Sequence, residues 1–136
     1  MNKLKWLVLL MVLILTVTAC SDQEEHSDHA EKKDISVEAL KVDLQGPDTL
    51  RKDEVGHFEA IVTQGNEKVD DADEVEFEIW KDGSKKESTL MEAQNEGDGV
   101  YSVEHTFEEE GEYIIQSHVT ARDMHTMPTK KVIVSN

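Results

Sequence analysis

Cysteine is almost absent from this chain, which contains one, Cys20, in 136 residues. One cysteine cannot form an internal disulfide or a two-thiol redox centre. The sequence also has no glycine-rich phosphate loop and no serine in the tight turn that presents a nucleophile in hydrolases. These absences exclude the commonest nucleotide-binding and nucleophilic enzymes, and we expect that the protein is not an enzyme.

Basic residues are also scarce, since 14 Lys and Arg stand against 30 Asp and Glu and the formal net charge is −16. An acidic surface of this kind repels nucleic acid and anionic lipid headgroups. The acidic runs at 70–74 and 108–110 do not have the spacing of a calcium loop and are more typical of solvated turns. We therefore expect no nucleic-acid partner.

The only long apolar run stands at the N-terminus. Two lysines precede an apolar stretch at residues 6–15 that is too short for a comfortable membrane span and is typical of a signal peptide. The V-T-A-C sequence that ends at Cys20 resembles the lipobox of bacterial lipoproteins. We predict that residues 1–19 are a lipoprotein signal peptide and that lipid chains on Cys20 anchor the protein to the extracytoplasmic face of the cell membrane. The alternative is an ordinary signal peptide.

A polar segment follows the predicted lipidation site. Residues 21–34 contain no apolar side chain larger than alanine, so they cannot bury enough surface to offset the entropy of ordering them. We predict that residues 20–35, including the lipidated cysteine, form a flexible acidic stalk. His26 and His29 lie in it, and whether they take part in metal binding stays open.

From residue 36 onward the hydrophobic period becomes two, which indicates β-strands. Apolar and polar residues alternate in six segments, at residues 40–44, 58–63, 75–79, 101–107, 113–119 and 132–134. A weaker seventh segment at Leu90 and Met91 fits an edge strand. No helical period is long enough to predict a helix. The spacing predicts one all-β domain at residues 36–136, an immunoglobulin-like Greek-key β-sandwich of about seven strands without a disulfide.

The start of the penultimate predicted strand has a distinctive pair. Gly111 stands two residues before Tyr113, an arrangement that resembles the tyrosine corner of Greek-key sandwiches. In that motif the phenol hydroxyl bonds back to the backbone. The pair therefore supports a sandwich.

The segment H-V-T-A-R-D-M-H-T-M-P at residues 118–128 carries the main functional hypothesis. Thioether sulfur is a good ligand for Cu(I), and imidazole suits both copper states. Strand parity puts His118 on the outer face, and we expect a loop that folds the following side chains back over it. We predict a metal site of His118, Met124, His125 and Met127, with copper as Cu(I) favoured. Zn(II) bound to the two histidines alone remains an alternative.

Three other side chains are weaker metal candidates. His105 shares core parity with its neighbours and is expected to be a partly buried histidine near a strand end. His57 points outward near a turn, and Met91 is expected to pack at an edge strand.

Four segments together resemble the YtkA-like family, which is close to the FixH-like proteins. They are F-E-A-I-V-T-Q-G at 58–65, V-E-F-E-I-W-K-D-G at 75–83, G-D-G-V-Y at 97–101 and the segment at 118–128. The resemblance implies a small membrane-anchored immunoglobulin-like domain with a link to copper binding and to oxidase copper assembly. Glycine commonly stands in this family where this chain has Asp123, so the turn there is expected to differ.

These observations favour a lipoprotein that binds copper and acts as a copper carrier or chaperone, with a membrane protein as copper donor or acceptor. Blue-copper electron transfer would need a cysteine thiolate that the domain lacks. The alternative is a metal-free immunoglobulin-like adaptor or adhesion module that binds another envelope protein through a sheet edge or its loops.

Overall fold

The computed structural model describes residues 38–136, which belong to a compact unit from Ser36 to Asn136. The predicted signal peptide, the lipidation site at Cys20 and the stalk histidines His26 and His29 lie outside the described residues. Within the described part, no helix is long and apolar enough to cross a membrane.

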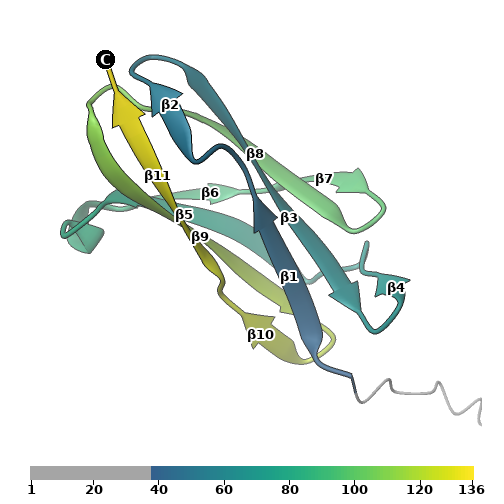
Figure 1. The fold of residues 1–136 in the computed structure, drawn as a ribbon. Coiled ribbons are helices and arrows are strands. Elements are labelled where there is room, and N and C mark those ends of the chain that lie inside the picture. Colours follow the sequence, from purple (N-terminus) through teal and green to yellow (C-terminus); the bar gives the residue numbers. More distant parts are fainter. Residues whose placement is uncertain (1–37) are drawn as a thin grey trace, which may run out of the picture. The chain divides into compact units, whose positions relative to one another are not determined.

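The described residues form eleven strands and one short 3-10 turn, η1 at Lys85–Glu87 (Figure 1). The strands are β1 (Leu40–Gln45), β2 (Thr49–Arg51), β3 (Val55–Gln64), β4 (Glu67–Lys68), β5 (Glu74–Lys81), β6 (Thr89–Glu92), β7 (Gln94–Gly97), β8 (Val100–Thr106), β9 (Gly111–Ala121), β10 (Met124–Thr126) and β11 (Thr129–Ser135). The seven predicted strands are all present. The additional strands, β2, β4, β7 and β10, are short, and each pairs with a longer neighbour.

Two sheets pack face to face. One has the order β1-β3-β8-β7 with β4 beside β3, and the other has the order β2-β11-β9-β5-β6 with β10 beside β9. The pairing of β2 with β11 is parallel, and the long strands pair antiparallel. This is the arrangement of immunoglobulin domains, with strands A, B, E and D in one sheet and C, F and G in the other. The predicted fold class is confirmed, as is the edge position of Leu90 and Met91 on β6.

One hydrophobic core lies between the sheets. Its fully buried large side chains are Phe58, Val62, Val69, Phe77, Phe107, Ile115, Val119 and Val132. Each side chain of this size contributes roughly 1.5–3 kcal/mol when buried. Because this core lies within the compact unit, we expect the unit to fold without the residues that precede it.

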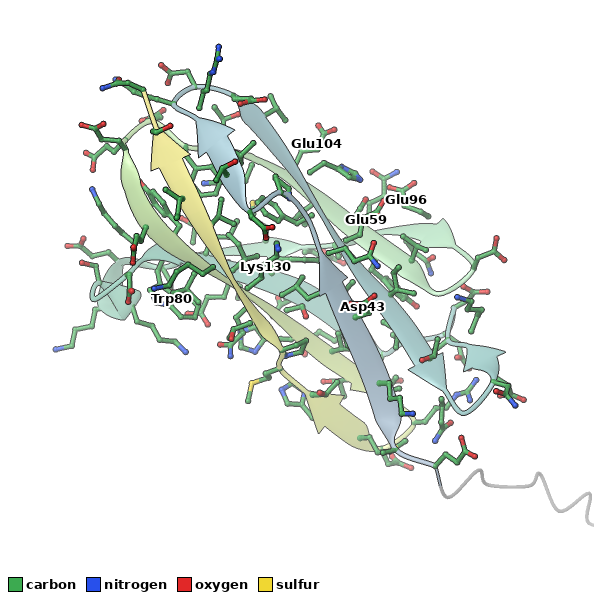
Figure 2. All side chains as sticks on the ribbon, in the orientation of Figure 1. Asp43, Glu59, Trp80, Glu96, Glu104 and Lys130 are labelled. Carbon is green, nitrogen blue, oxygen red and sulfur yellow. The ribbon has the colours of Figure 1, made fainter. Side chains whose placement is uncertain are left out.

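Charged side chains cover the outer faces. Figure 2 shows Glu59, Glu96 and Glu104 gathered on the sheet that holds β3, β7 and β8, while Trp80 projects from the other sheet. The alternation of buried and exposed residues along β3 and β5 produces this division. Each sheet thus has one face for the core and one for solvent or ligands.

The predicted tyrosine corner is present at the start of β9. The hydroxyl of Tyr113 donates a hydrogen bond to the carbonyl oxygen of Glu109 at 3.0 Å, and its ring lies 4.6 Å from that of Phe107 between centroids. Gly111 has φ of +145°, and a Cβ there would come within 2.7 Å of the Lys81 Cε. These contacts fix where β9 begins, and β9 carries the candidate site.

Candidate metal centre

The connection from β9 to β10 is a tight hairpin. The chain reverses at Arg122 and Asp123, whose φ values of 51° and 61° are both positive, as a type I′ turn requires. Residues Met124–Thr126 then form β10 and pair antiparallel with β9. The expectation of a longer loop that folds its tip back over the strand is therefore wrong.

Arg122 holds this turn against the opposite sheet. Its guanidinium donates hydrogen bonds to Gln64 Oε1 at 2.8 Å and to Glu67 Oε2 at 3.0 Å. These partners lie on β3 and β4, so the contact ties the β9–β10 hairpin to the β3–β4 hairpin. The position of β10 is thus determined by both sheets.

β10 and β11 pair with β9 in the same register on either side of a two-residue gap at Met127 and Pro128. The gap arises because proline has no N–H to donate to the ladder. Its carbonyl still accepts a hydrogen bond from the Ser117 N–H at 3.1 Å. Because the register is unchanged across the gap, Met127 lies level with His118.

Three of the four predicted ligands share the outer face of the sheet. His118 lies between buried residues of β9 and therefore projects outward. His125 is exposed on β10, and Met127 is 49% exposed. The structure therefore brings His118, His125 and Met127 to one face.

Met124 does not join this group. It pairs with Ala121, which is fully buried, and its side chain packs against the hydrophobic core. The reason is parity, because Met124 and His125 are consecutive residues of a strand and must point to opposite faces. The predicted site is corrected in this respect.

Each of the two imidazoles has one nitrogen held by a neighbouring side chain. His118 Nε2 lies 3.0 Å from Glu78 Oε2, and His125 Nδ1 lies 2.8 Å from Thr120 Oγ1. An ionised carboxylate can only accept a hydrogen bond, so Nε2 of His118 carries the proton and Nδ1 keeps a lone pair. The Thr120 hydroxyl can donate or accept, and in the tautomer in which it accepts from Nδ1, the Nε2 of His125 keeps its lone pair. Metal-bound histidines commonly have their second nitrogen held like this.

Glu78 is suited to this role because it stays ionised. Its pKa is lowered chiefly by a hydrogen bond with the Ser88 side chain, against an opposing effect of burial, and His118 and Lys85 lower it further. The Glu78 side chain is 16% exposed, and Lys85 Nζ lies 3.8 Å from Glu78 Oε2. The carboxylate is thus a fixed acceptor for His118.

The separation of the two rings is compatible with one shared ion. The ring centroids of His118 and His125 are 6.2 Å apart, with 36° between the planes. With a metal–nitrogen distance of about 2.0 Å and about 1.2 Å from nitrogen to ring centre, two imidazoles on one ion have centroids at most about 6.4 Å apart. Among residues 38–136, no three His, Cys, Asp or Glu side chains are grouped to hold a metal. A site here therefore depends on the Met127 thioether as the third donor.

His105 lies away from these residues, on β8. Its ring packs edge-on against Phe107, with centroids 4.7 Å apart. Burial lowers its pKa, and the charge of Glu108 opposes this with a smaller effect. The expectation of a partly buried histidine is confirmed.

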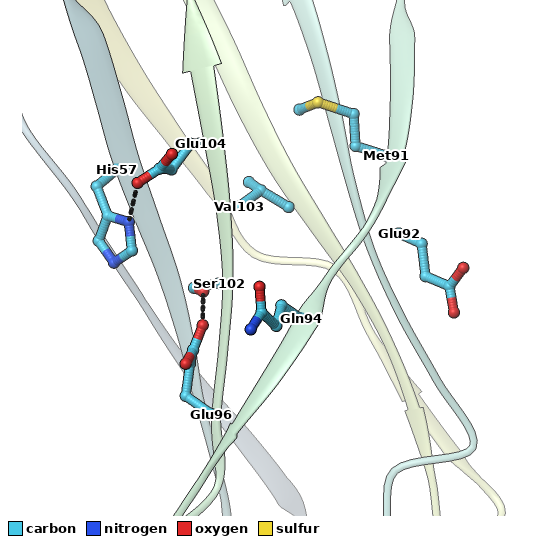
Figure 3. A pocket seen from close by; sticks show the side chains of 8 residues that line it. All are labelled: His57, Met91, Glu92, Gln94, Glu96, Ser102, Val103 and Glu104. Carbon is cyan, nitrogen blue, oxygen red and sulfur yellow. Dashed lines mark hydrogen bonds and ion pairs between the residues drawn. The ribbon is translucent and has the colours of Figure 1, made fainter.

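His57 and Met91 line a cavity of about 390 Å³ (Figure 3). His57 Nε2 lies 3.1 Å from Glu59 Oε1, and its side chain is half exposed, as its outward parity indicated. Met91 packs partly buried against the core. Figure 3 shows these two side chains on opposite sides of the cavity, with Val103 between them. The remaining lining residues are Glu92, Gln94, Glu96, Ser102 and Glu104.

Sequence reasoning did not identify Glu78 and Thr120 as part of the site. Alternation put Glu78 on the outer side of its strand, which is where it lies. What was missing is that β5 pairs directly with β9, because this pairing brings Glu78 beside His118 across 40 positions of sequence.

Comparison with known proteins identifies a family. Residues 35–118 match the family model described as YtkA-like. The match spans more than half of the chain and ends at His118, so His125 and Met127 lie beyond it. No curated protein matches this sequence.

Two groups of solved structures are similar at a distance. The CARDB domain of a Pyrococcus furiosus protein, crystallised in complex with di-metal ions, is 19% identical, with 71% of this chain and 88% of that chain covered and a TM-score of 0.44. Superoxide reductase (neelaredoxin) from Ignicoccus hospitalis is 13% identical, with 80% and 93% covered and a TM-score of 0.48. Neither likeness bears on function. The match over residues 35–118 shows that this chain belongs to the YtkA-like family.

Proposed function

We propose that this YtkA-like domain binds copper as Cu(I) and carries it to or from a membrane protein. The ligands are His118 through Nδ1, His125 through Nε2 and Met127 through its sulfur. The observation that carries the proposal is that two imidazoles and an exposed thioether share one face while each imidazole has its other nitrogen engaged. Thr120 and Glu78 would then hold the rings in the orientation that the metal needs.

The donor set favours Cu(I) over other metals. Thioether sulfur selects Cu(I), whereas hard cations such as Mg²⁺ and Ca²⁺ take oxygen ligands. Structural Zn²⁺ sites have four protein ligands, and the residues described here offer two imidazoles and one thioether on this face. Zinc therefore remains the weaker alternative.

The position of the site supports a carrier. His125 and Met127 are exposed, so a partner's ligands can reach the ion without unfolding the domain. The described residues contain no cysteine to supply the thiolate of an electron-transfer copper site. Exchange of the ion between proteins is the role that an open site of this kind serves.

The proposed location is the extracytoplasmic face of the cell membrane, with lipid chains on Cys20 as the anchor. Removal of residues 1–19 would take away two of the 14 basic residues and none of the 30 acidic ones, which gives a net charge of −18. Such a domain is repelled by anionic headgroups and would stand away from the membrane on its stalk. Replacement of Cys20 with serine should release the protein from the membrane fraction, and retention in that fraction would count against lipidation.

Titration of residues 36–136 with Cu(I) against a competing chelator tests the copper proposal. The unmodified domain should bind Cu(I) with a dissociation constant below about 1 μM. The affinity of the His125→Ala, Met127→Ala double variant for Cu(I) should be about a hundredfold lower or more. His57→Ala is the matched control, since it removes an exposed imidazole elsewhere. Equal affinity of the unmodified domain and the double variant would refute the proposed site, and Zn²⁺ titration of the same proteins tests the zinc alternative.

A metal-free adaptor is the second candidate. Leu90 on β6 and Ile133 on β11 are 56% and 46% exposed on the same sheet, and they would supply apolar contacts to a protein partner. In that case the double variant should capture the same envelope partner with or without a copper chelator. A Leu90→Asp, Ile133→Asp variant should lose it.

A further inference from the structure

The three methionines of residues 36–136 have different environments. Met91 and Met124 pack partly buried against the core, whereas Met127 is 49% exposed. Met127 is also the residue whose sulfur the proposed copper site requires. Of these three methionines, the most exposed is thus the one whose sulfur the proposed copper site uses.

We propose that Met127 is an oxidative modification site and that its conversion to methionine sulfoxide switches off Cu(I) binding. This inference rests on the proposed function. The oxidant is a peroxide: the sulfur gives up two electrons, the O–O bond of hydrogen peroxide breaks, one oxygen bonds to sulfur and the other leaves as water. The product can be reduced again by methionine sulfoxide reductases, so the modification is reversible.

The chemistry of the product explains the switch. In the sulfoxide, oxygen replaces sulfur as the exposed donor, and oxygen is a hard ligand that Cu(I) does not favour. His118 and His125 keep their nitrogens and their contacts with Glu78 and Thr120. Oxidation therefore removes Cu(I) selectivity and leaves a two-imidazole pair that suits Zn(II) or Cu(II).

The fold should tolerate the modification. The Met127 side chain lies outside the core, and the backbone contact of this residue is made by its carbonyl, which accepts from Gln116 Nε2 at 3.4 Å. Met124, three residues earlier, faces the core and serves as an internal reference. A protective effect of burial predicts slower oxidation at Met124 than at Met127.

The test is treatment of metal-free residues 36–136 with hydrogen peroxide, followed by peptide mapping and Cu(I) titration. Met127 should oxidise at least about tenfold faster than Met124. The oxidised protein should lose about tenfold or more in Cu(I) affinity but keep its Zn(II) affinity, and a methionine sulfoxide reductase should restore Cu(I) binding. Ag(I), a redox-inert substitute for Cu(I), should protect Met127 when added first.

Met127→Leu is the matched variant, because leucine keeps the volume and cannot be oxidised; its Cu(I) affinity should be low and unchanged by peroxide. If the untreated protein does not bind Cu(I), the proposed function fails. If it binds Cu(I) and oxidation of Met127 leaves the affinity unchanged, or if Met124 oxidises as fast, this inference fails alone.

Discussion

Replacement of Glu78 by alanine tests whether the outer-face histidines form a prepared metal site. The change removes the oxygen that lies 3.0 Å from His118 Nε2. Both side chains are mostly shielded, at 21% and 16% exposed, so water replaces the carboxylate poorly. Loss of an acceptor that orients a metal-bound histidine commonly costs 10–100-fold in affinity, which corresponds to about 1.4–2.7 kcal/mol. We expect Cu(I) affinity of the Glu78→Ala variant to fall within that range.

The chain supplies a matched control for this variant. His57 and Glu59 form a second histidine–carboxylate pair, with a distance of 3.1 Å, on the other sheet. Glu59→Ala makes the same change of net charge and removes the same kind of contact, but it should leave Cu(I) affinity unchanged. Glu78→Gln should give an intermediate loss, because its amide oxygen still accepts a hydrogen bond.

Two measurements are needed. Competition with a Cu(I) chelator gives the affinities, and nitrogen NMR of the imidazoles in the metal-free protein shows which nitrogen of His118 carries the proton. The unmodified protein should have the proton on Nε2, and Glu78→Ala should populate both tautomers. Unchanged affinity in Glu78→Ala, or equal losses in Glu78→Ala and Glu59→Ala, would refute the orienting role of Glu78.

Three further predictions concern stability. Burial lowers the pKa of His105, so the folded protein binds fewer protons at this residue than the unfolded chain does. The free energy of unfolding should therefore fall as pH drops below about 6.5. The His105→Leu variant should show a smaller difference in urea midpoint between about pH 7.5 and about pH 5 than the unmodified protein. The Ser117 Oγ is buried without a hydrogen-bond partner in the described structure. The Ser117→Ala variant should therefore have the same free energy of unfolding as the unmodified protein or one higher by up to about 1 kcal/mol. A clearly lower free energy of unfolding in chemical denaturation would contradict this. Asp123 has φ of 61°, so Asp123→Gly should raise stability by about 0.5 kcal/mol in thermal unfolding, whereas a lower midpoint would show that the aspartate side chain contributes to the turn.

The long strands were predictable because their signal is local. Val75, Phe77 and Ile79 alternate with acidic residues, and in the structure the first three are buried. The glycine and tyrosine at 111 and 113 likewise predicted a contact that spans four residues, and it is present. Periodicity and short-range motifs carry such information because burial on one face imposes them residue by residue.

The short strand β10 could not be predicted in this way. The segment at 124–126 is too short to show an alternation of its own, and a loop was expected there. Its strand conformation depends on pairing with β9 and on the anchoring of Arg122 to the opposite sheet. Those are contacts between distant parts of the chain, and a local pattern does not contain them.

The amino-acid sequence by itself showed that the chain is acidic, predicted the β-sandwich domain correctly, and placed histidine and methionine side chains close together near the C-terminal end. Only the tertiary structure decided which donors meet. A hairpin register shifted by one residue would exchange the faces of Met124 and His125, because successive side chains of a strand point in opposite directions. The observed register packs Met124 against the core and places Met127 level with His118, and the pairing of β5 with β9 brings Glu78 beside His118.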